Sequence, residues 1–317
     1  MKISVAIAAC RGGRFIGEQL ASIAGQTRKV DEVVICDDAP DELTALAVKK
    51  YAGILPLKYV VNSETLGVTG NFNKALSLTT GDIVFLCDQD DVWYPEKIAV
   101  MSAMFVPGTV MGVFCDSDIT DEKGECLGLT HFESRGYGDL RNISPGKWQE
   151  QLENSCLRFP AAGHDMAVSR ELLTLLLPLP DLTACHDNYL GVAGAALEAW
   201  HLMPQSLGIF RRHSSSASGA GRKMSLAGEL RAARQSVKDN TFAWNAALFQ
   251  AVLNRLPALP EEKKALLYRR MEHSKVRAAM DGSFFRRVLP VWREWRAGNY
   301  RKFGRGWKNV LQDLFLR

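Results

Sequence analysis

The stretch Val84-Phe85-Leu86-Cys87-Asp88-Gln89-Asp90-Asp91-Val92-Trp93 carries four apolar residues directly into three carboxylates within four positions. The apolar run follows the turn signal Gly81-Asp82, and its composition is typical of a strand that is buried on both faces. Carboxylates packed this closely repel one another, so we expect a positive partner among them. Mg²⁺ or Mn²⁺ is such a partner, and either ion can also hold the phosphates of a nucleotide. The other interpretation of so short a pattern is a solvated acidic turn followed by a helix.

Three further apolar runs precede this one, and a helical pattern separates each run from the next. The predicted strands are residues 3–9, 33–36, 57–61 and 82–87. Residues 14–26 and 43–51 are predicted helices, and residues 67–78 a turn followed by a helix that Asn71 could cap. The order β-α-β-α-β-α-β predicts an α/β fold with a doubly wound, mostly parallel sheet.

Two of the predicted strands end in carboxylates. Strand 33–36 runs into Asp37 and Asp38, and strand 82–87 runs into the acidic stretch 88–91. Ligands bind at the carboxyl ends of the strands in doubly wound sheets, so two acidic ends at one sheet edge predict a nucleotide and metal site. No G-x-G-x-x-G follows the first strand and no G-x-x-x-x-G-K-[ST] occurs. Their absence argues against a dinucleotide oxidoreductase and against a P-loop enzyme.

The second half of the chain has a less regular pattern. It contains predicted strands at 110–115, 125–129 and 207–212, and a predicted helix at 170–177 that Pro178 ends. A small-residue helix is predicted over 188–199, directly after His186 and Asp187. From residue 225 to 280 the pattern predicts a run of helices broken at Pro257 and Pro260.

The composition is that of an ordinary globular protein, because 47% of the 317 residues are hydrophobic and 23% are charged. No apolar run reaches the roughly 18 residues that a membrane-spanning helix needs. The seven cysteines form no C-x-x-C pair. Such usage favours reduced thiols in a cytosolic protein.

Positive charge is concentrated at the end of the chain. From Phe284 to Arg317 nine basic and two acidic residues give +7, whereas the whole chain carries +4. Aromatic and aliphatic residues lie among the arginines, which suits a basic amphipathic surface for anionic lipid. No nucleic-acid-binding motif accompanies the charge, so nucleic acid is not a predicted partner. Pro290 and three glycines are expected to divide the stretch into two or three short helices; the alternative is a helix that packs on the protein body with its arginines in solvent.

Six short motifs resemble those of a known family, in the same order. Residues 15–23 (F-I-G-E-Q-L-A-S-I) are similar to its Y-I-x-E-Q-L-x-S-I, residues 37–38 to D-D-G-S, and residues 66–72 to N-L-G-V-x-x-N-F. Residues 88–93 resemble its D-Q-D-D-x-W, residues 186–187 its H-D-W-W, and residues 211–213 its Y-R-x-H. Over about residues 1–220 the chain therefore resembles the family 2 glycosyltransferases of the rhamnosyltransferase-like group.

The resemblance implies a GT-A fold with a C-terminal helical extension. Residues 1–220 would form the catalytic domain, with a nucleotide-sugar half at about 1–115 and an acceptor half at about 116–220. Residues 221–317 would form the helical extension with its basic tail. The implied activity is inverting, metal-dependent transfer of a sugar to a cell-surface polysaccharide or lipid-linked glycan. The implied donor is dTDP-rhamnose, with a UDP-sugar as the alternative. The basic tail, in a chain without a membrane-spanning run, predicts a cytoplasmic protein held at the inner face of the membrane.

Site residues follow from the resemblance position by position. Asp38 would contact the base or ribose, Asp88 the ribose or the metal's water shell, and Asp90 the metal, Mg²⁺ or Mn²⁺. Asp187 would be the general base, although an Asp that opens a helix can also be a plain N-terminal cap. The remaining candidates for binding the nucleotide sugar are Ala8, Arg11, Asn71, Gln89, Arg212 and His213.

The chain departs from the family pattern after the first strand. The family's A-T-Y-N is Ala8-Ala9-Cys10-Arg11 here, and D-D-G-S continues as Ala39-Pro40. Arg11 could supply a phosphate contact in place of the usual residues. Two other classes remain open from the residues alone. A nucleotidyltransferase would carry a glycine-rich basic loop after the first strand, which Arg11-Gly12-Gly13-Arg14 faintly resembles. A receiver-like module would hold Mg²⁺ at acidic strand ends but would leave the later residues without a role.

Overall fold

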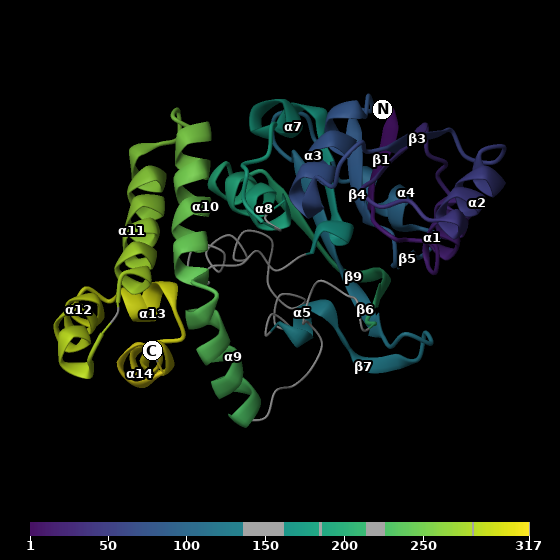
Figure 1. The fold of residues 1–317 in the computed structure, drawn as a ribbon. Helices are drawn as coiled ribbons and strands as arrows, with labels where there is room; N and C mark the ends of the chain where they lie inside the picture. Colours follow the sequence, from purple (N-terminus) through teal and green to yellow (C-terminus); the bar gives the residue numbers. More distant parts are fainter. Residues whose placement is uncertain (136–161, 184–185, 214–225, 281, 317) are drawn as a thin grey trace. The chain divides into compact units, whose positions relative to one another are not determined.

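The computed structural model describes residues 1–135, 162–183, 186–213, 226–280 and 282–316 (Figure 1). These residues form two compact units, one holding the described residues up to His213 and the other those from Leu226 onward. The domain boundary predicted at residue 220 lies outside the described residues, so the division at that position stays a prediction.

Among the described residues, nine strands form one sheet in the order β3-β2-β1-β4-β8-β6-β9-β5, with β7 paired to β6 (Figure 1). The strands are β1 (Ile3–Ala9), β2 (Glu32–Asp37), β3 (Leu57–Val61), β4 (Ile83–Asp88), β5 (Val92–Trp93), β6 (Gly112–Thr120), β7 (Cys126–Thr130), β8 (Met166–Ser169) and β9 (Trp200–Arg211). The first four strands are parallel to one another, and β6 is parallel to β9. β8 enters antiparallel between β4 and β6.

The helices of the first unit cover both faces of this sheet. They are α1 (Ile16–Ala24), α2 (Glu42–Tyr51), α3 (Gly67–Leu78), α4 (Lys97–Ser102), α5 (His131–Ser134), the 3₁₀ turn η2 (Gly163–Asp165), α7 (Arg170–Leu176) and α8 (His186–Ala196). The chain passes from β1 to β2 and β3, then reverses to β4. Right-handed crossovers therefore place α1 and α2 on one face and α3 on the other. The doubly wound α/β arrangement predicted from the sequence is confirmed.

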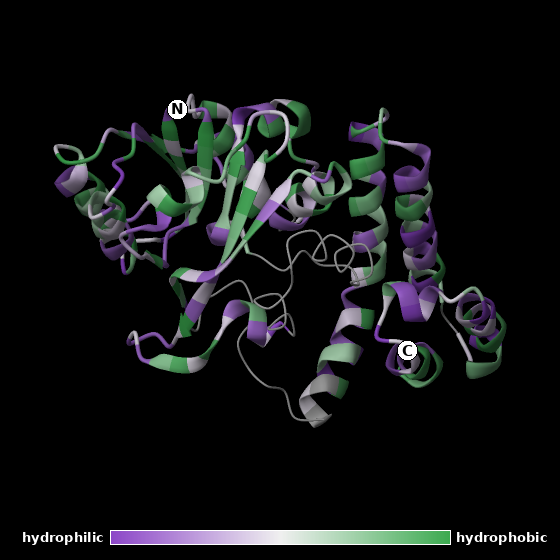
Figure 2. Cartoon of the chain, turned by 180° about the vertical axis from the view of Figure 1, so that it is seen from behind, coloured by the Kyte–Doolittle hydropathy of each residue, from purple (hydrophilic) through white to green (hydrophobic). Residues whose placement is uncertain are grey.

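Alternate residues of the central strands supply the core. Ile3, Val5 and Ile7 of β1 pack in one cluster with the apolar positions of α1, α2 and α4. Figure 2 shows the hydrophobic residues concentrated along the strands of the sheet. A strand with both faces covered must be apolar on both, which is why β1, β2 and β4 are nearly continuous apolar runs.

The reversal of strand order between β1 and β4 places the acidic segments at one edge. Ala9 at the end of β1 pairs with Asp37 of β2, and Ala8 pairs with Asp88 of β4. The carboxyl ends of three parallel strands therefore meet at the switch point, where ligands bind in such sheets.

Two details of the predicted elements are wrong. Asn71 does not cap α3, because it lies in the second turn of a helix that begins at Gly67. Pro290 does not interrupt the C-terminal segment, because α12 (Phe284–Arg296) passes through it. A proline inside a helix costs about 3 kcal/mol, so packing around Pro290 must outweigh that cost.

The second unit is helical. Its elements are α9 (Leu226–Lys238), α10 (Thr241–Arg255), α11 (Glu261–Ala278), α12, α13 (Asn299–Phe303) and α14 (Trp307–Phe315). The glycines lie between the helices, as expected: Gly298 directly precedes α13, and Gly306 directly precedes α14. Met280, Val291 and Tyr300 form a small core with residues of α11 and α14 packed against it, so this core joins α11 to α14. Within the described residues, no helix is both long enough and apolar enough to cross a bilayer.

Candidate active site

The loop after β4 is fastened to the loop after β1 through Gln89. The Gln89 side chain accepts a hydrogen bond from the Cys10 backbone N–H (2.8 Å) and donates one to the Cys10 carbonyl (2.9 Å). A Cβ on Gly12 would lie 2.4 Å from Oε1 of Gln89, so the close approach of the two loops requires glycine there. Gln89, a predicted nucleotide-sugar ligand, thus has its amide occupied by backbone groups.

The end of β2 is held in the same way. Asp38 Oδ1 accepts hydrogen bonds from Asn62 Nδ2 (2.6 Å) and from the Leu66 backbone N–H (3.1 Å). Asn71 is buried, and its side-chain nitrogen donates to the carbonyls of Ala9 and Cys36 (both 3.0 Å). Asn71 therefore fixes the ends of β1 and β2. It can support a nucleotide site by holding these strand ends in place, because its own polar atoms are already occupied.

Asp90 and His213 meet at this edge although 123 positions separate them in the sequence. His213 Nε2 lies 2.8 Å from Asp90 Oδ2, and the imidazole stacks on Phe15 with ring centroids 4.6 Å apart. Burial and the charge of Asp88 raise the pKa of Asp90, and His213 opposes this rise. One carboxylate oxygen and one imidazole nitrogen at this separation can bind one divalent ion together.

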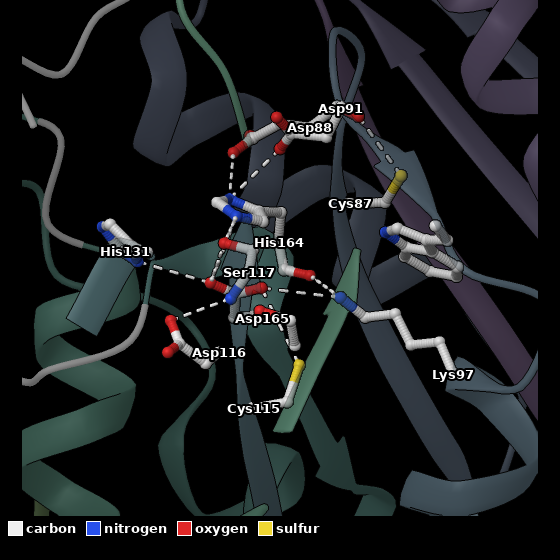
Figure 3. Close-up of polar contacts among 12 residues, drawn as sticks. Cys87, Asp88, Asp91, Lys97, Cys115, Asp116, Ser117, His131, His164 and Asp165 are labelled. Atoms are coloured by element: carbon white, nitrogen blue, oxygen red, sulfur yellow. Dashed lines mark hydrogen bonds and ion pairs between the residues drawn. The ribbon is translucent and has the colours of Figure 1, made fainter. Parts of the chain in front are cut away.

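A second group of polar residues lies beneath the acidic loop. His164 of η2 is buried, and its Nδ1 lies 3.1 Å from Asp91 Oδ2 and 3.6 Å from Asp88 Oδ2 (Figure 3). Its Nε2 lies 3.2 Å from Asp165 Oδ2. Lys97, also buried, lies 3.6 Å from the same Asp165 carboxylate. The sequence motifs do not identify His164, Asp165 or Lys97. The only sequence signal for this cluster is the polar pair His164-Asp165, directly before the apolar residues of β8.

These buried groups balance one another's charges. Burial would lower the pKa of His164, but Asp165 and Asp91 outweigh that effect and raise it well above its usual value. Burial would raise the pKa of Asp165, but His164, His131 and Lys97 hold it well below its usual value. Asp88, Asp91 and His164 lie close enough to share a metal ion themselves, with ligand atoms within 4.8 Å. The outer pair Asp90–His213, with Asp88 beside it, is a second arrangement that could hold a divalent ion.

The carboxylate of Asp187 lies in the first turn of α8. That helix begins at His186, so Asp187 is a helical residue and not the cap, and its Oδ1 accepts the Asn188 backbone N–H (2.7 Å). His186 stacks on Phe72 with centroids 4.1 Å apart, and a Cβ on Gly163 would lie 2.5 Å from its Nε2. His186 is also among the groups that lower the pKa of Asp88 against the effect of burial, after His164. The start of α8 therefore adjoins the acidic edge.

The three remaining predicted ligands surround this edge. Ala8 lies in β1 between Cys36 and Asp88. Arg11 has an exposed side chain and a φ of 52°. Arg212 is half-buried, and its backbone N–H donates to the Thr120 carbonyl (3.0 Å). The predicted donor-site residues thus lie on the ends of β1, β2, β4 and β9 and the loops that follow them, except Asn71, which reaches the ends of β1 and β2 from α3.

Comparisons with known proteins agree with this arrangement. Residues 4–146 match the sequence model of "Glycosyl transferase family 2". An uncharacterized glycosyltransferase, alr2836 of Nostoc sp., is 33% identical over 240 residues, which are 72% of this chain and 68% of that protein. This chain matches two further relatives over less than half of their own length, namely 44% and 46%.

Two solved structures are similar in fold. S. aureus TarS 1–349 in complex with UDP-GlcNAc has a TM-score of 0.56 and 18% identity over 95% of this chain and 90% of that one. The mannosyltransferase PcManGT of Pyrobaculum calidifontis, in complex with GDP-Man and Mn²⁺, has a TM-score of 0.53 and 20% identity over 99% of this chain and 84% of that one. At these identities the likeness concerns the fold.

Proposed function

This chain belongs to glycosyltransferase family 2, and on that premise we propose that it transfers a sugar from a nucleotide-sugar donor in a metal-dependent reaction that inverts the anomeric carbon. Its fold is similar to that of GT-A glycosyltransferases. The family removes the nucleotidyltransferase and receiver-like alternatives. We also propose that residues 1–220 are the catalytic domain, with the donor bound by about residues 1–115 and the acceptor by about residues 116–220.

The observation that carries the proposal is the contact of Asp90 with His213 (2.8 Å) at the carboxyl ends of the strands. These two side chains would hold Mg²⁺ or Mn²⁺, and Asp88 would contact the ribose or the ion's water shell. When bound, the ion would act as a Lewis acid that stabilises the diphosphate leaving group. Asp38 would bind the base or ribose, and the exposed Arg11 and the half-buried Arg212 would contact phosphate.

The acceptor hydroxyl must lose its proton as it attacks, and Asp187 is the proposed base. A single displacement needs one base on the acceptor side and inverts the anomeric centre. The position of Asp187 in the first turn of α8 supports this role, because the same turn carries His186 next to the acidic edge. The hydrogen bonds from Asn188 to Asp187 Oδ1 fix the orientation of the carboxylate (2.7 and 2.9 Å).

We propose dTDP-rhamnose as the donor, because the motifs resemble the rhamnosyltransferase-like group. A UDP-sugar is the second candidate. The test is to incubate the full chain with dTDP-rhamnose, UDP-sugars and GDP-mannose, with Mn²⁺ and glycan acceptors, and to follow the release of nucleoside diphosphate. NMR of the product gives its anomeric configuration. A product that retains the donor's configuration would contradict the inverting mechanism, and full activity in EDTA would contradict metal dependence.

We further propose that the second unit binds the cytoplasmic face of an anionic membrane, where a lipid-linked acceptor would be found. Large apolar side chains are exposed on α12 and α14: Phe285 (84%), Leu289 (50%), Trp292 (47%), Trp295 (62%), Trp307 (68%), Leu311 (43%) and Phe315 (62%). We call these residues the α12/α14 face. Phe284 joins its two halves, because its ring lies 5.4 Å from that of Phe315. Such a face buries aromatic and aliphatic groups at a lipid interface.

The charges around the α12/α14 face support an anionic partner. Both acidic residues of this segment are engaged inside the unit: Glu294 accepts from His273 (2.6 Å), and Asp313 accepts from Arg277 (2.7 Å). Arg286, Arg293 and Arg296 are exposed on α12. Each basic residue close to an anionic leaflet contributes about 1 kcal/mol. The proposed localisation is therefore cytoplasmic and peripheral to the membrane.

A further inference from the structure

His164 lies between two sets of carboxylates and is 1% exposed. Its Nδ1 faces Asp91 at 3.1 Å and Asp88 at 3.6 Å, and its Nε2 faces Asp165 at 3.2 Å (Figure 3). Nε2 also lies 3.3 Å from the hydroxyl oxygen of Ser117. Phe210 stacks on the ring with centroids 5.2 Å apart and planes 3° from parallel. The imidazole is thus stacked on one face and has carboxylates beside both nitrogens, although Nδ1 makes no hydrogen bond in this geometry.

Asp91 passes this constraint on to the end of β9. Its Oδ2 faces His164, whereas its Oδ1 accepts the backbone N–H of Arg211 (3.1 Å). Arg211 is the last residue of β9, two positions before His213. Asp91 is also the next residue after Asp90, which meets His213 at 2.8 Å. One buried carboxylate therefore connects His164 to both partners of the proposed metal pair.

We propose that His164 is a positioning residue that holds Asp91 against the end of β9 and so keeps Asp90 and His213 together for the divalent ion. His164 does not touch the ion in this arrangement. The inference rests on the proposed metal-dependent function, and it assigns a role to the buried cluster that the transfer reaction itself does not use.

Two other roles for His164 predict different results. If His164 acted only as a nearby positive charge, its removal would strengthen Mn²⁺ binding, because like charges repel. If His164 were itself a ligand, with Asp88 and Asp91, its removal would weaken Mn²⁺ binding directly. The hydrogen bond between Asp91 and the end of β9 would then have no part in the effect. A positioning role predicts weaker binding that depends on Asp91.

The test uses the full chain and Mn²⁺ alone, with free Mn²⁺ measured by electron paramagnetic resonance. His164→Gln should weaken Mn²⁺ binding by about 10- to 100-fold, the range for losing a residue that supports a metal ligand. The matched control is His131→Gln. His131 is also fully buried and its Nδ1 lies 3.4 Å from the same Asp165, but this ion pair is with Asp165 and not with Asp88 or Asp91. The control should bind Mn²⁺ like the wild type, although both variants should unfold at a lower temperature.

A double-mutant cycle tests whether His164 and Asp91 act through each other, provided that thermal melts show each variant to be folded. Asp91→Asn keeps an oxygen for the Arg211 N–H but removes the carboxyl group that faces His164. In that background His164→Gln should cause little further loss of Mn²⁺ affinity. Unchanged or tighter binding by His164→Gln, or losses that simply add in the double variant, would overturn the inference. Failure of the proposed function is a separate result, because the wild type would then bind no Mn²⁺ at all, and His164 would have no metal pair to position.

Discussion

At the residue scale, the carboxylates of the acidic edge differ in their burial and in the charges beside them. Asp91 is buried against His164 and the end of β9, whereas Asp90 retains 20% side-chain exposure beside His213. Three carboxylates in four positions can therefore do different things: one orders the loop, and the others remain accessible to a ligand. Burial and neighbouring charge, not residue type, make this distinction.

The first prediction concerns Asp90. Asp90→Asn keeps the shape of the side chain but removes the negative charge of the proposed metal ligand. We expect Mn²⁺ affinity to fall by more than about tenfold and turnover to be lost. Isothermal titration with Mn²⁺, together with a thermal melt to verify folding, measures this. Wild-type Mn²⁺ affinity in Asp90→Asn would place the ion elsewhere.

The second prediction concerns Asp187. Asp187→Asn should lower kcat by about 100-fold or more, the range for losing a general base. Donor binding should be almost unchanged, because the carboxylate acts on the acceptor. Asn188→Ala is the matched control, since it removes one hydrogen bond to Asp187 and leaves the base in place. Loss of donor affinity with turnover of bound donor intact would show Asp187 to be a donor ligand instead.

At the scale of elements, the sequence predicts those strands and helices whose structure depends on the local pattern of residues. β1 to β4 and their helices follow from apolar periodicity, and the acidic ends of β2 and β4 follow from strand order. The four residues of β8 (Met166–Ser169) are too few for a period to identify, and their place between β4 and β6 depends on pairing with distant strands. The motifs assign Asp90 and His213 to one site, but their direct contact depends on where β9 ends. The meeting of His164 with Asp91 is also non-local, and no motif includes His164.

The third prediction concerns the link between α11 and α12. His273 and Asn299 both donate to Glu294, and together with nearby positive charge they lower its pKa against the effect of burial. A carboxyl whose folded pKa lies below its unfolded value of 4.5 stabilises the fold above that pH. This stability is lost as the pH falls through the folded pKa.

Glu294→Gln should therefore melt below the wild type at neutral pH. The difference in Tm should shrink below about pH 4.5, where the wild-type carboxyl also takes a proton. Differential scanning calorimetry of both proteins from pH 7 to pH 3 measures this. A difference that stays constant over that range would mean that Glu294 stabilises the helices by shape and not by charge.

At the scale of the whole molecule, each unit offers a different chemistry. The first unit gathers carboxylates at a sheet edge, and the second exposes aromatic residues among arginines. Residues such as Val291, Tyr300 and Phe303 are buried in the second unit, so only part of the apolar content of the tail is available to lipid. The membrane proposal therefore depends on the exposed positions of the α12/α14 face.

The fourth prediction tests that face. Trp292→Ser with Trp295→Ser should reduce co-sedimentation with phosphatidylglycerol vesicles by roughly tenfold, because each lost indole removes buried apolar area at the interface. Wild-type binding should fall with added salt and be weak to phosphatidylcholine. Tyr268→Ser is the matched control, since Tyr268 is an exposed aromatic residue of α11 (48%). Equal pelleting of the double variant and the wild type would contradict the proposal. Point variants are sharper than a truncation, which would also remove Val291 and Tyr300 from the core.

The contact between Asp90 and His213 also bears on the order of events while the chain is being made. The two residues are 123 positions apart, so a ribosome that has released β1 to β4 has exposed the acidic loop without its imidazole partner. Chains fold from the N-terminus during synthesis, and the sheet can begin to form at that stage. The site itself must wait for β9, and the α12/α14 face emerges later still. A nascent chain thus completes its chemical centre before it acquires the surface proposed to bring that centre to the membrane.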